Sequence, residues 1–365
     1  MTKHNLRLLD LYTDYLLSSF GATTATGLAR LVPEISHDQI TRFLAQQPLT
    51  DKDLWQLIKQ DVRAIASPDA VLIIDDTVEE KPYTDESELV TWHYDHSQGR
   101  LVKGINLLSA LYYSRDVSLP VGFELIQKTL LTTDPKTGKD KWVSPRTKNE
   151  LARDLIQRTV HKQIPFRFVL ADVWFASADN MVFIKQKAKK EFVMPLKSNR
   201  RVALSAQDRN RGRWKSLASL EFKAGAALTL YLEGVPFPLL VVREVFTNED
   251  GSEGTLLLAC SDTSVSASAL WPIYQKRWKV EEYHKSLKQN AALAKSPTKL
   301  PHTQQNHVFA SLLAFCKLES CCIPSKTNHF ALKAKLYHAA LSSAFEQLML
   351  LKERCSLTPY HTLTA

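Results

Sequence analysis

The sequence predicts an α/β protein in which a mixed sheet is flanked by helices, with an all-helical region before it and a β-rich segment within it. Three observations predict this architecture. Between residues 67 and 197, short apolar runs alternate with segments of helical spacing, which is typical of an α/β sheet. Residues 1–66 carry apolar side chains at helical spacing. Residues 198–262 contain short strand-like runs separated by turn residues.

The first 66 residues are expected to form a helical domain. The stretch from Ser36 to Gln39 has the form of a capping box, which marks the start of a helix after a tight turn. Two short helices joined in this way could be a DNA-binding helix-turn-helix, with Gln39 and Arg42 among the side chains that face the groove. A plain helical bundle packed on the main domain explains the same pattern, so both interpretations stay open.

Two predicted buried strands end on carboxylates. The run 71–74 is followed by Asp75 and Asp76, and the run 166–171 is followed by Asp172. An acidic residue in this position is often functional in α/β sheets, although a lone Asp there is more commonly a turn or cap residue, which is the interpretation we prefer for Asp76. Further elements are expected as strands at 105–113, 122–126 and 191–196, and as helices at about 147–162 and 178–189.

A third carboxylate lies on a helix expected over about residues 268–290. With 3.6 residues per turn, the side chains of Tyr274, Arg277, Glu281 and Lys288 fall within an arc of about 60°, and Lys285 lies beside it. A solvated face is the alternative, because such pairs contribute only about 0.3–0.5 kcal/mol each. In the functional interpretation, the acids bind divalent cations and the neighbouring side chains contact DNA phosphates.

Taken together, these motifs resemble those of a known family, the DDE-type insertion-sequence transposases of the group with a Tyr-Arg-Glu-Lys signature. That signature is Tyr, two residues, Arg, three, Glu, six, Lys. The resemblance runs from about residue 10 to 325, with three motifs in the right order. They are IIDDT with Asp75, ADVWF with Asp172, and the signature itself at Tyr274, Arg277, Glu281 and Lys288.

The resemblance implies a ribonuclease-H-like core with a β-strand insertion between the second aspartate and the glutamate. It implies that Asp75, Asp172 and Glu281 bind Mg²⁺ or Mn²⁺, as two ions, and catalyse cut-and-paste transposition. The implied partners are double-stranded DNA, both transposon end repeats and target, and a second copy of the chain in a homodimer. One departure is Thr255, which stands where relatives carry a Trp that stacks on a flipped base, so the hairpin route is left open.

Composition sets the remaining expectations. The 365 residues carry 47 Lys and Arg against 38 Asp and Glu, a net charge of +9, which makes a polyanion a plausible partner. Lys197 and Arg200 begin a basic stretch that could contact phosphates or form a solvated loop. The N-terminus has no signal-peptide pattern and no apolar run approaches 18 residues, so we expect a cytoplasmic protein, nucleoid-associated when bound to DNA, with no membrane partner.

One further stretch contains residue types that can bind a metal ion. His93, Asp95 and His96 could suggest a metal site, but no fourth ligand is evident, and a structural or DNA-contacting role is preferred. Two alternatives to an active transposase are a catalytically silent DNA-binding regulator and a ribonuclease-H-like nuclease without strand transfer.

The expected domains are a helical DNA-binding domain (1–66), the first part of the catalytic core (67–197), a β-rich insertion (198–262), the second part of the core with C-terminal helices (263–352) and a tail (353–365).

Overall fold

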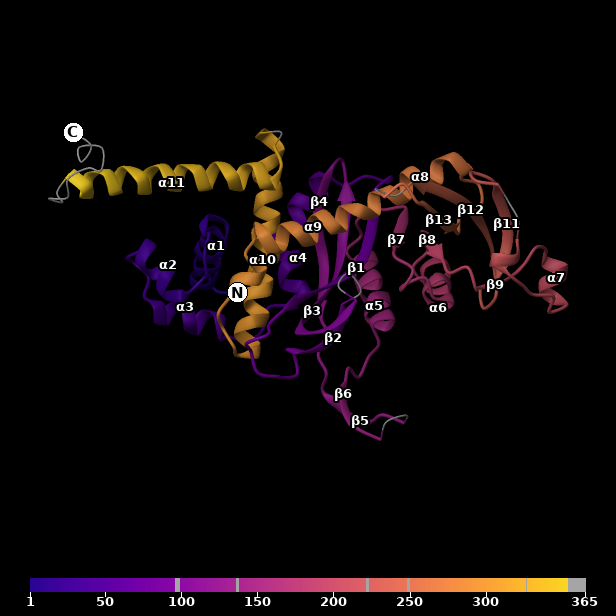
Figure 1. Cartoon of the computed structure of the whole chain (residues 1–365), viewed down its shortest axis with the longest axis horizontal. Helices are drawn as coiled ribbons and strands as arrows, with labels where there is room; N and C mark the ends of the chain where they lie inside the picture. Colours follow the sequence, from indigo (N-terminus) through magenta and orange to yellow (C-terminus); the bar gives the residue numbers. More distant parts are fainter. Residues whose placement is uncertain (96–98, 136–137, 221–222, 248–249, 326, 354–365) are drawn as a thin grey trace, which may run out of the picture.

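The computed structural model shows a mixed α/β fold built around one large sheet (Figure 1). N-terminal helices lie at one end of the sheet and the predicted β-rich segment forms the other end. Apart from its first position, the predicted tail lies outside the described residues, as does His96. The described residues are 1–95, 99–135, 138–220, 223–247, 250–325 and 327–353.

The centre of the sheet mixes parallel and antiparallel pairs. It contains β1 (Val71–Glu80), β2 (Thr91–Asp95), β3 (Arg100–Ser114), β4 (Val117–Leu125), β7 (Phe168–Ala171) and β8 (Glu191–Leu196). β1 pairs antiparallel with β3 and parallel with β7, which pairs parallel with β8. β2 and β4 pair antiparallel with different parts of β3. β1 and β7 are apolar and buried over the stretches that pair with each other, 71–74 and 168–171, as strands covered on both faces must be.

The β-rich segment continues this sheet instead of forming one of its own. Its strand β13 (Glu253–Cys260) pairs antiparallel with β8, so the hydrogen-bonded ladder passes from the centre directly into the segment. The core is continuous as well, because Val241, Leu258 and Cys260 are fully buried. The remaining elements of the segment are β9 (Arg201–Ala203), α7 (Ala206–Asn210), β10 (Lys215–Ser216), a 3-10 turn (Leu217–Ser219), β11 (Ala227–Leu232) and β12 (Pro238–Thr247).

Helices cover the sheet largely where the sequence predicts them. The helix expected at 147–162 is α5 (Lys148–His161), and the one at 178–189 is α6 (Ala178–Val182) followed by a π-helical turn (Phe183–Lys187). The single helix expected over 268–290 is wrong at its centre, where a 3-10 turn (Lys276–Trp278) joins α8 (Ala267–Gln275) to α9 (Lys279–Gln289). Bonds from residue i to i+3 tighten this turn, which changes the angular position of Arg277 on the helical stripe.

The N-terminal helices pack around a long C-terminal helix. Tyr12 Oη lies 2.9 Å from His307 Nδ1, which fastens the first helix to the long one, and the predicted capping box at Ser36 is confirmed. The helix α10 (Pro301–Ser325) is long and apolar enough to span a membrane, yet 61% of its most apolar 18 residues are buried inside the protein, as in the core helix of a folded domain. The other elements are α1 (Lys3–Ser18), α2 (Ala25–Leu31), α3 (His37–Leu44), α4 (Asp51–Ala64) and a 3-10 turn (Leu293–Lys295).

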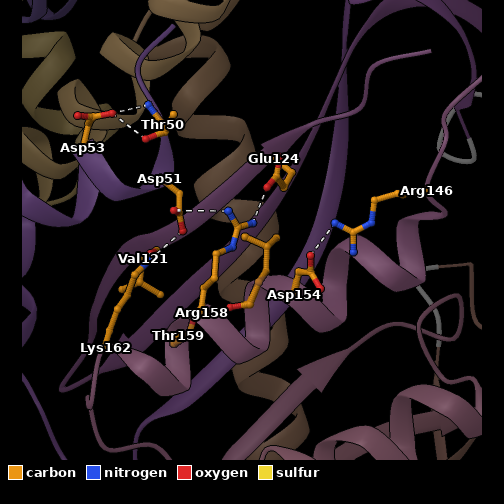
Figure 2. A network of polar contacts seen from close by, with 11 residues as sticks. Thr50, Asp51, Asp53, Val121, Glu124, Arg146, Asp154, Arg158, Thr159 and Lys162 are labelled. Atoms are coloured by element: carbon orange, nitrogen blue, oxygen red, sulfur yellow. Dashed lines mark hydrogen bonds and ion pairs between the residues drawn. The ribbon is translucent and has the colours of Figure 1, made fainter. Parts of the chain in front are cut away.

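A buried ionic network fastens α4 to the sheet and to α5 (Figure 2). Asp51 accepts a hydrogen bond of 3.0 Å from Lys162 Nζ, and these two side chains are only 7% and 9% exposed. Arg158 lies 3.5 Å from Asp51 and also donates to Glu124 of β4. Two carboxylates thus meet two cations, an arrangement in which the charges balance.

Two elements project from the body of the molecule (Figure 1). One is a hairpin of β5 (Leu130–Thr133) and β6 (Asp140–Val143), which pair with each other and not with the main sheet. The other is α11 (His329–Glu353), which extends from the top of α10 over the N-terminal helices.

Candidate active site

The register of β1 and β7 brings the first two predicted acids together. The last parallel pair is Ile74 opposite Ala171, so Asp75 is the next residue after this pair on β1 and Asp172 is the next residue after β7. Residues at equivalent positions of a parallel pair face the same side of the sheet. The two carboxylates therefore meet on one face, at the point where β7 ends.

The expectation that the first strand ends at residue 74 is wrong, and so is the turn interpretation of Asp76. β1 runs on to Glu80 because β3 continues to supply hydrogen-bond partners, as far as the pair of Glu80 and Gly104. Within the strand, Asp76 faces the side opposite Asp75. Its carboxylate accepts hydrogen bonds from Lys148 Nζ at 2.6 Å and Asn106 Nδ2 at 2.9 Å.

The surroundings of Asp75 and Asp172 disfavour their negative charges. Burial, followed by the nearby carboxylates of Asp172 and Asp76, raises the pKa of Asp75 to about 7, against the opposing effect of Arg277. Burial also raises the pKa of Asp172, although backbone N–H groups of Trp174 and Phe175 donate to its carboxylate and partly offset this. A bound cation would relieve this unfavourable electrostatic environment.

Arg277 connects the third predicted acid to the first. Its Nη1 lies 3.7 Å from Asp75 Oδ2 and its Nη2 donates to Glu281 Oε1 at 2.7 Å. The guanidinium side chain is 13% exposed, whereas that of Glu281 is 61% exposed. Glu281 is therefore held beside the aspartates through Arg277. Across the described ranges, no group of three or more His, Cys, Asp or Glu side chains is already arranged to hold a metal ion.

Two family models match the chain. A family model described as DDE superfamily endonuclease matches residues 2–219, and one described as transposase DDE domain matches residues 124–316. The chain belongs to the DDE transposase superfamily. The first match contains Asp75 and Asp172, and the second contains Asp172 and Glu281. A comparison with curated proteins finds no match.

The predicted phosphate-binding side chains of this DDE protein differ in what they contact. Tyr274 is buried beside Arg277, with the guanidinium 5.8 Å from its ring centre. Lys288 Nζ donates to the Val78 carbonyl of β1 at 2.8 Å. Lys285 instead lies over the ring of Phe330 at 5.2 Å, at the start of α11. The structure thus gathers Tyr274, Arg277 and Lys288 at the sheet, whereas Lys285 is engaged by the C-terminal helix.

Two polar residues that the sequence analysis did not select, Asn106 and His284, lie near Asp76 of the DDE protein. His284 Nε2 and Asn106 Oδ1 are buried without a hydrogen-bond partner, as is Arg277 Nε. Buried polar atoms are normally paired, so unpaired ones at a site call for an explanation such as a missing ligand. His284 lies three residues after Glu281 on α9, a spacing that could have revealed it. Asn106 is a polar residue in an otherwise apolar strand, which is also a readable signal.

Basic residues occur where the core of the DDE protein passes into the β-rich segment. Lys197 Nζ lies 5.3 Å from the ring centre of Trp174, the residue two positions after Asp172. Arg200 is the next basic residue after Lys197. Nearby elements enclose a shallow cavity of about 730 Å³ that is not at the carboxylates. Its lining includes Arg153, Lys187, Arg209 and Trp214.

The remaining predicted residues are not part of this site. Gln39 and Arg42 lie on α3, at the end of the molecule far from β7 (Figure 1). Gln39 Oε1 accepts from the Ser36 backbone, and Arg42 Nε donates to the Asp38 carbonyl. His93 Nε2 lies 2.8 Å from Thr91 Oγ1 within β2, so the described histidine of the His93 to His96 stretch has a local partner.

Proposed function

We propose that the protein is a cut-and-paste transposase of the Tyr-Arg-Glu-Lys group. It hydrolyses DNA at transposon ends, and the freed 3′-hydroxyl then attacks a phosphodiester of target DNA, which joins the transposon end to the target and releases a target 3′-hydroxyl. The observation that carries the proposal is the position of Asp75 and Asp172 next to each other, directly after the last β1–β7 pair of Ile74 with Ala171, in a member of the DDE superfamily. The three acids Asp75, Asp172 and Glu281 are the proposed catalytic residues. Thr255 leaves open whether a DNA hairpin forms during excision.

The donor chemistry of this site fits Mg²⁺ or Mn²⁺. Both ions prefer oxygen ligands, and the two buried aspartates have raised pKa values that a cation would lower. Glu281 would join them as the third ligand. Its side chain is exposed and is held by a hydrogen bond to Arg277, so it can turn towards a cation when that bond breaks. Two bound ions would supply an activated nucleophile and stabilise the leaving oxygen.

The residues of the chain itself orient the DNA. Arg277 would exchange Glu281 for a phosphate, to which a guanidinium can donate two parallel hydrogen bonds. The same guanidinium positions the hydroxyl of Tyr274. Lys288 adds a localised positive charge beside β1. Lys197 and Arg200, together with Lys285 at the start of α11, would hold phosphates further along the duplex.

The strand order supports a ribonuclease-H-like core, with β4, β3, β1, β7 and β8 as its central sheet and β3 as the antiparallel member. Within this proposal the core spans 67–197 and 263–352, interrupted by the insertion at 198–262. The helices before residue 67 would bind the terminal repeats, with Gln39 and Arg42 of α3 in the groove. The protein would act as a homodimer on two DNA ends, in the cytoplasm and at the nucleoid.

A plasmid assay tests the proposed function. The purified full chain is incubated with Mg²⁺ and a supercoiled plasmid that carries the inverted repeats flanking the gene. Excision with joining to a target is the expected result. Binding without cutting would instead indicate a silent regulator, and cutting without joining would indicate a nuclease, the activity named in the endonuclease family match. Asp61→Asn, a change at an exposed carboxylate of α4, is the control for Asp172→Asn.

A further inference from the structure

The shallow cavity between the core and the β-rich segment is a second candidate site, separate from the carboxylates. Its volume is about 730 Å³, which lies within the range of roughly 300–1,000 Å³ that ligand sites occupy. Its walls come from two parts of the chain. The core contributes α5, α6 and the π-helical turn, and the segment contributes α7, Trp214 and the turn at 234–236. We call this cavity the α6–α7 pocket.

The backbone around the α6–α7 pocket is unusual. In the π-helical turn, Ala188 N donates to the Phe183 carbonyl at 2.9 Å. Turns of this kind are rare and occur frequently at functional sites. On the segment side, Gly234 has a φ of +81°, and a Cβ at this position would lie 3.1 Å from Ala178 Cβ. The turn at 234–236 therefore packs closely on the start of α6, which fixes the two walls relative to each other.

Three cations line the α6–α7 pocket, against one carboxylate. The cations are Arg153, Lys187 and Arg209, and the carboxylate is that of Asp179. Within the part of the chain that the structure describes, none of these three cations forms an ion pair with a carboxylate, whereas Arg213 of the same segment does. The charge of the pocket is positive, which favours an anionic ligand.

Hydrogen bonds hold the two arginines of the pocket in place. Arg153 Nη1 donates to Asn180 Oδ1 at 2.7 Å, and the buried Asn180 donates in turn to the Phe175 carbonyl at 2.9 Å. Arg209 Nη1 donates to the Pro236 carbonyl at 2.8 Å. A guanidinium has five N–H donors, so each arginine is positioned by the protein and keeps donors for a ligand.

The rest of the lining is apolar or aromatic. Its members are Trp214, which is partly exposed, and Val182, Phe183, Val235 and Pro236. A simple anion would contact the cations and leave this surface uncovered. A ligand with an anionic group at one end and a flat ring at the other would use both parts of the lining.

We propose that the α6–α7 pocket binds a nucleoside phosphate. Arg153, Lys187 and Arg209 hold the phosphate, and the base stacks on Trp214. A free nucleotide and an unpaired nucleotide at the end of a DNA strand share this chemistry. The pocket lies away from the catalytic carboxylates and needs no metal ion, so the inference goes beyond the proposed function.

Fluorescence anisotropy of the labelled nucleotide mant-dADP tests the pocket, with the full chain and without Mg²⁺. The wild type should bind the probe saturably. Trp214→Ala should weaken binding by about fivefold or more, because stacking is lost, and Trp214→Phe should keep most of the affinity. Lys187→Gln should weaken binding by a similar factor. Trp142→Ala and Lys52→Gln are the matched controls at exposed residues of β6 and α4, and both should bind like the wild type.

Unlabelled competitors identify what the pocket recognises. dTMP should displace the probe, whereas thymidine and inorganic phosphate should each compete about tenfold less well, since each lacks one of the two groups. An oligothymidylate that competes more strongly than dTMP would assign the pocket to the end of a DNA strand. Equal competition by the two would assign it to a free nucleotide.

Several outcomes would overturn the assignment. These are a wild type that does not bind the probe, Trp214→Ala and Lys187→Gln variants that bind it normally, and equal losses in the two controls. Inorganic phosphate that competes as well as dTMP would show a plain anion site instead. Equal circular dichroism spectra would show that the variants fold. The plasmid assay plays no part in these outcomes, so failure of the pocket and failure of the proposed function are distinguishable.

Discussion

The chain holds two groups of buried or partly buried charges, and they are assembled differently. In the network beneath α4, Asp51 and Glu124 face Lys162 and Arg158, so each carboxylate contacts a cation (Figure 2). At the candidate active site, one cation faces three carboxylates. Arg277 forms an ion pair with Glu281, and its positive charge also lowers the pKa values of Asp75 and Asp172. One group is balanced, and the other has an excess of negative charge.

The difference separates a structural role from a functional one. Removing one partner from a balanced buried pair leaves an uncompensated charge, which strongly destabilises a protein. Removing one acid from an overcharged group relieves repulsion and leaves folding intact, while any chemistry that depends on the excess charge is lost.

The largest expected effect is on DNA cleavage by Asp172→Asn. Loss of a metal ligand should remove several kcal/mol of transition-state stabilisation, which corresponds to a fall in the cleavage rate of about 10³-fold or more. The amide oxygen can still accept the Trp174 N–H, so the melting temperature should stay unchanged or rise. Gel assays of cleavage and thermal melting measure the two effects. Normal cutting by this variant would show that Asp172 is not catalytic.

The next largest effect is on stability, for Asp51→Ala. This change leaves the buried Lys162 with the Val121 carbonyl but without its carboxylate partner, and the free energy of unfolding should fall by roughly 3–5 kcal/mol. Asp53→Ala is the control on the same helix, because Asp53 is a partly exposed capping residue whose loss should cost only about 1 kcal/mol. Urea unfolding measures both values. Equal losses would mean that the network beneath α4 does not stabilise the fold as described.

A smaller effect concerns pH and Mg²⁺. Because the pKa of Asp75 is raised from 3.8 to about 7, the folded protein keeps this proton while the unfolded chain loses it. The contribution of Asp75 to stability therefore falls as pH rises from about 4 to 7. Mg²⁺ competes with the proton, so it should raise the melting temperature more at pH 8 than at pH 5.5. Asp75→Asn should remove this difference; a shift that is independent of pH in the wild type would count against the site.

Local sequence patterns were enough to predict the elements that carry the acids. The apolar runs before Asp75 and Asp172 predicted β1 and β7, and the mixed α/β class is confirmed. The extension of β1 to Glu80 was missed, because its partner β3 is supplied by a distant part of the chain. The merging of the β-rich segment with the core sheet was missed for the same reason, since it depends on the pairing of β13 with β8.

Side-chain partners were harder to predict than backbone elements. Helical spacing correctly placed Arg277 beside Glu281, a local pair. It could not show that Arg277 also reaches Asp75, or that Lys285 turns towards Phe330 on α11. Both contacts join residues on different elements, and they form only when the helices pack.

The most direct test of the central claim is anomalous diffraction from crystals of the full chain soaked with Mn²⁺. The account predicts an anomalous peak within coordination distance of the Asp75 and Asp172 carboxylates, with Glu281 released from Arg277 and turned towards the ion. Crystals of Asp172→Asn should lack the peak. The account would be contradicted if the wild-type crystals showed no peak at this position, or if a bound ion left Glu281 paired with Arg277.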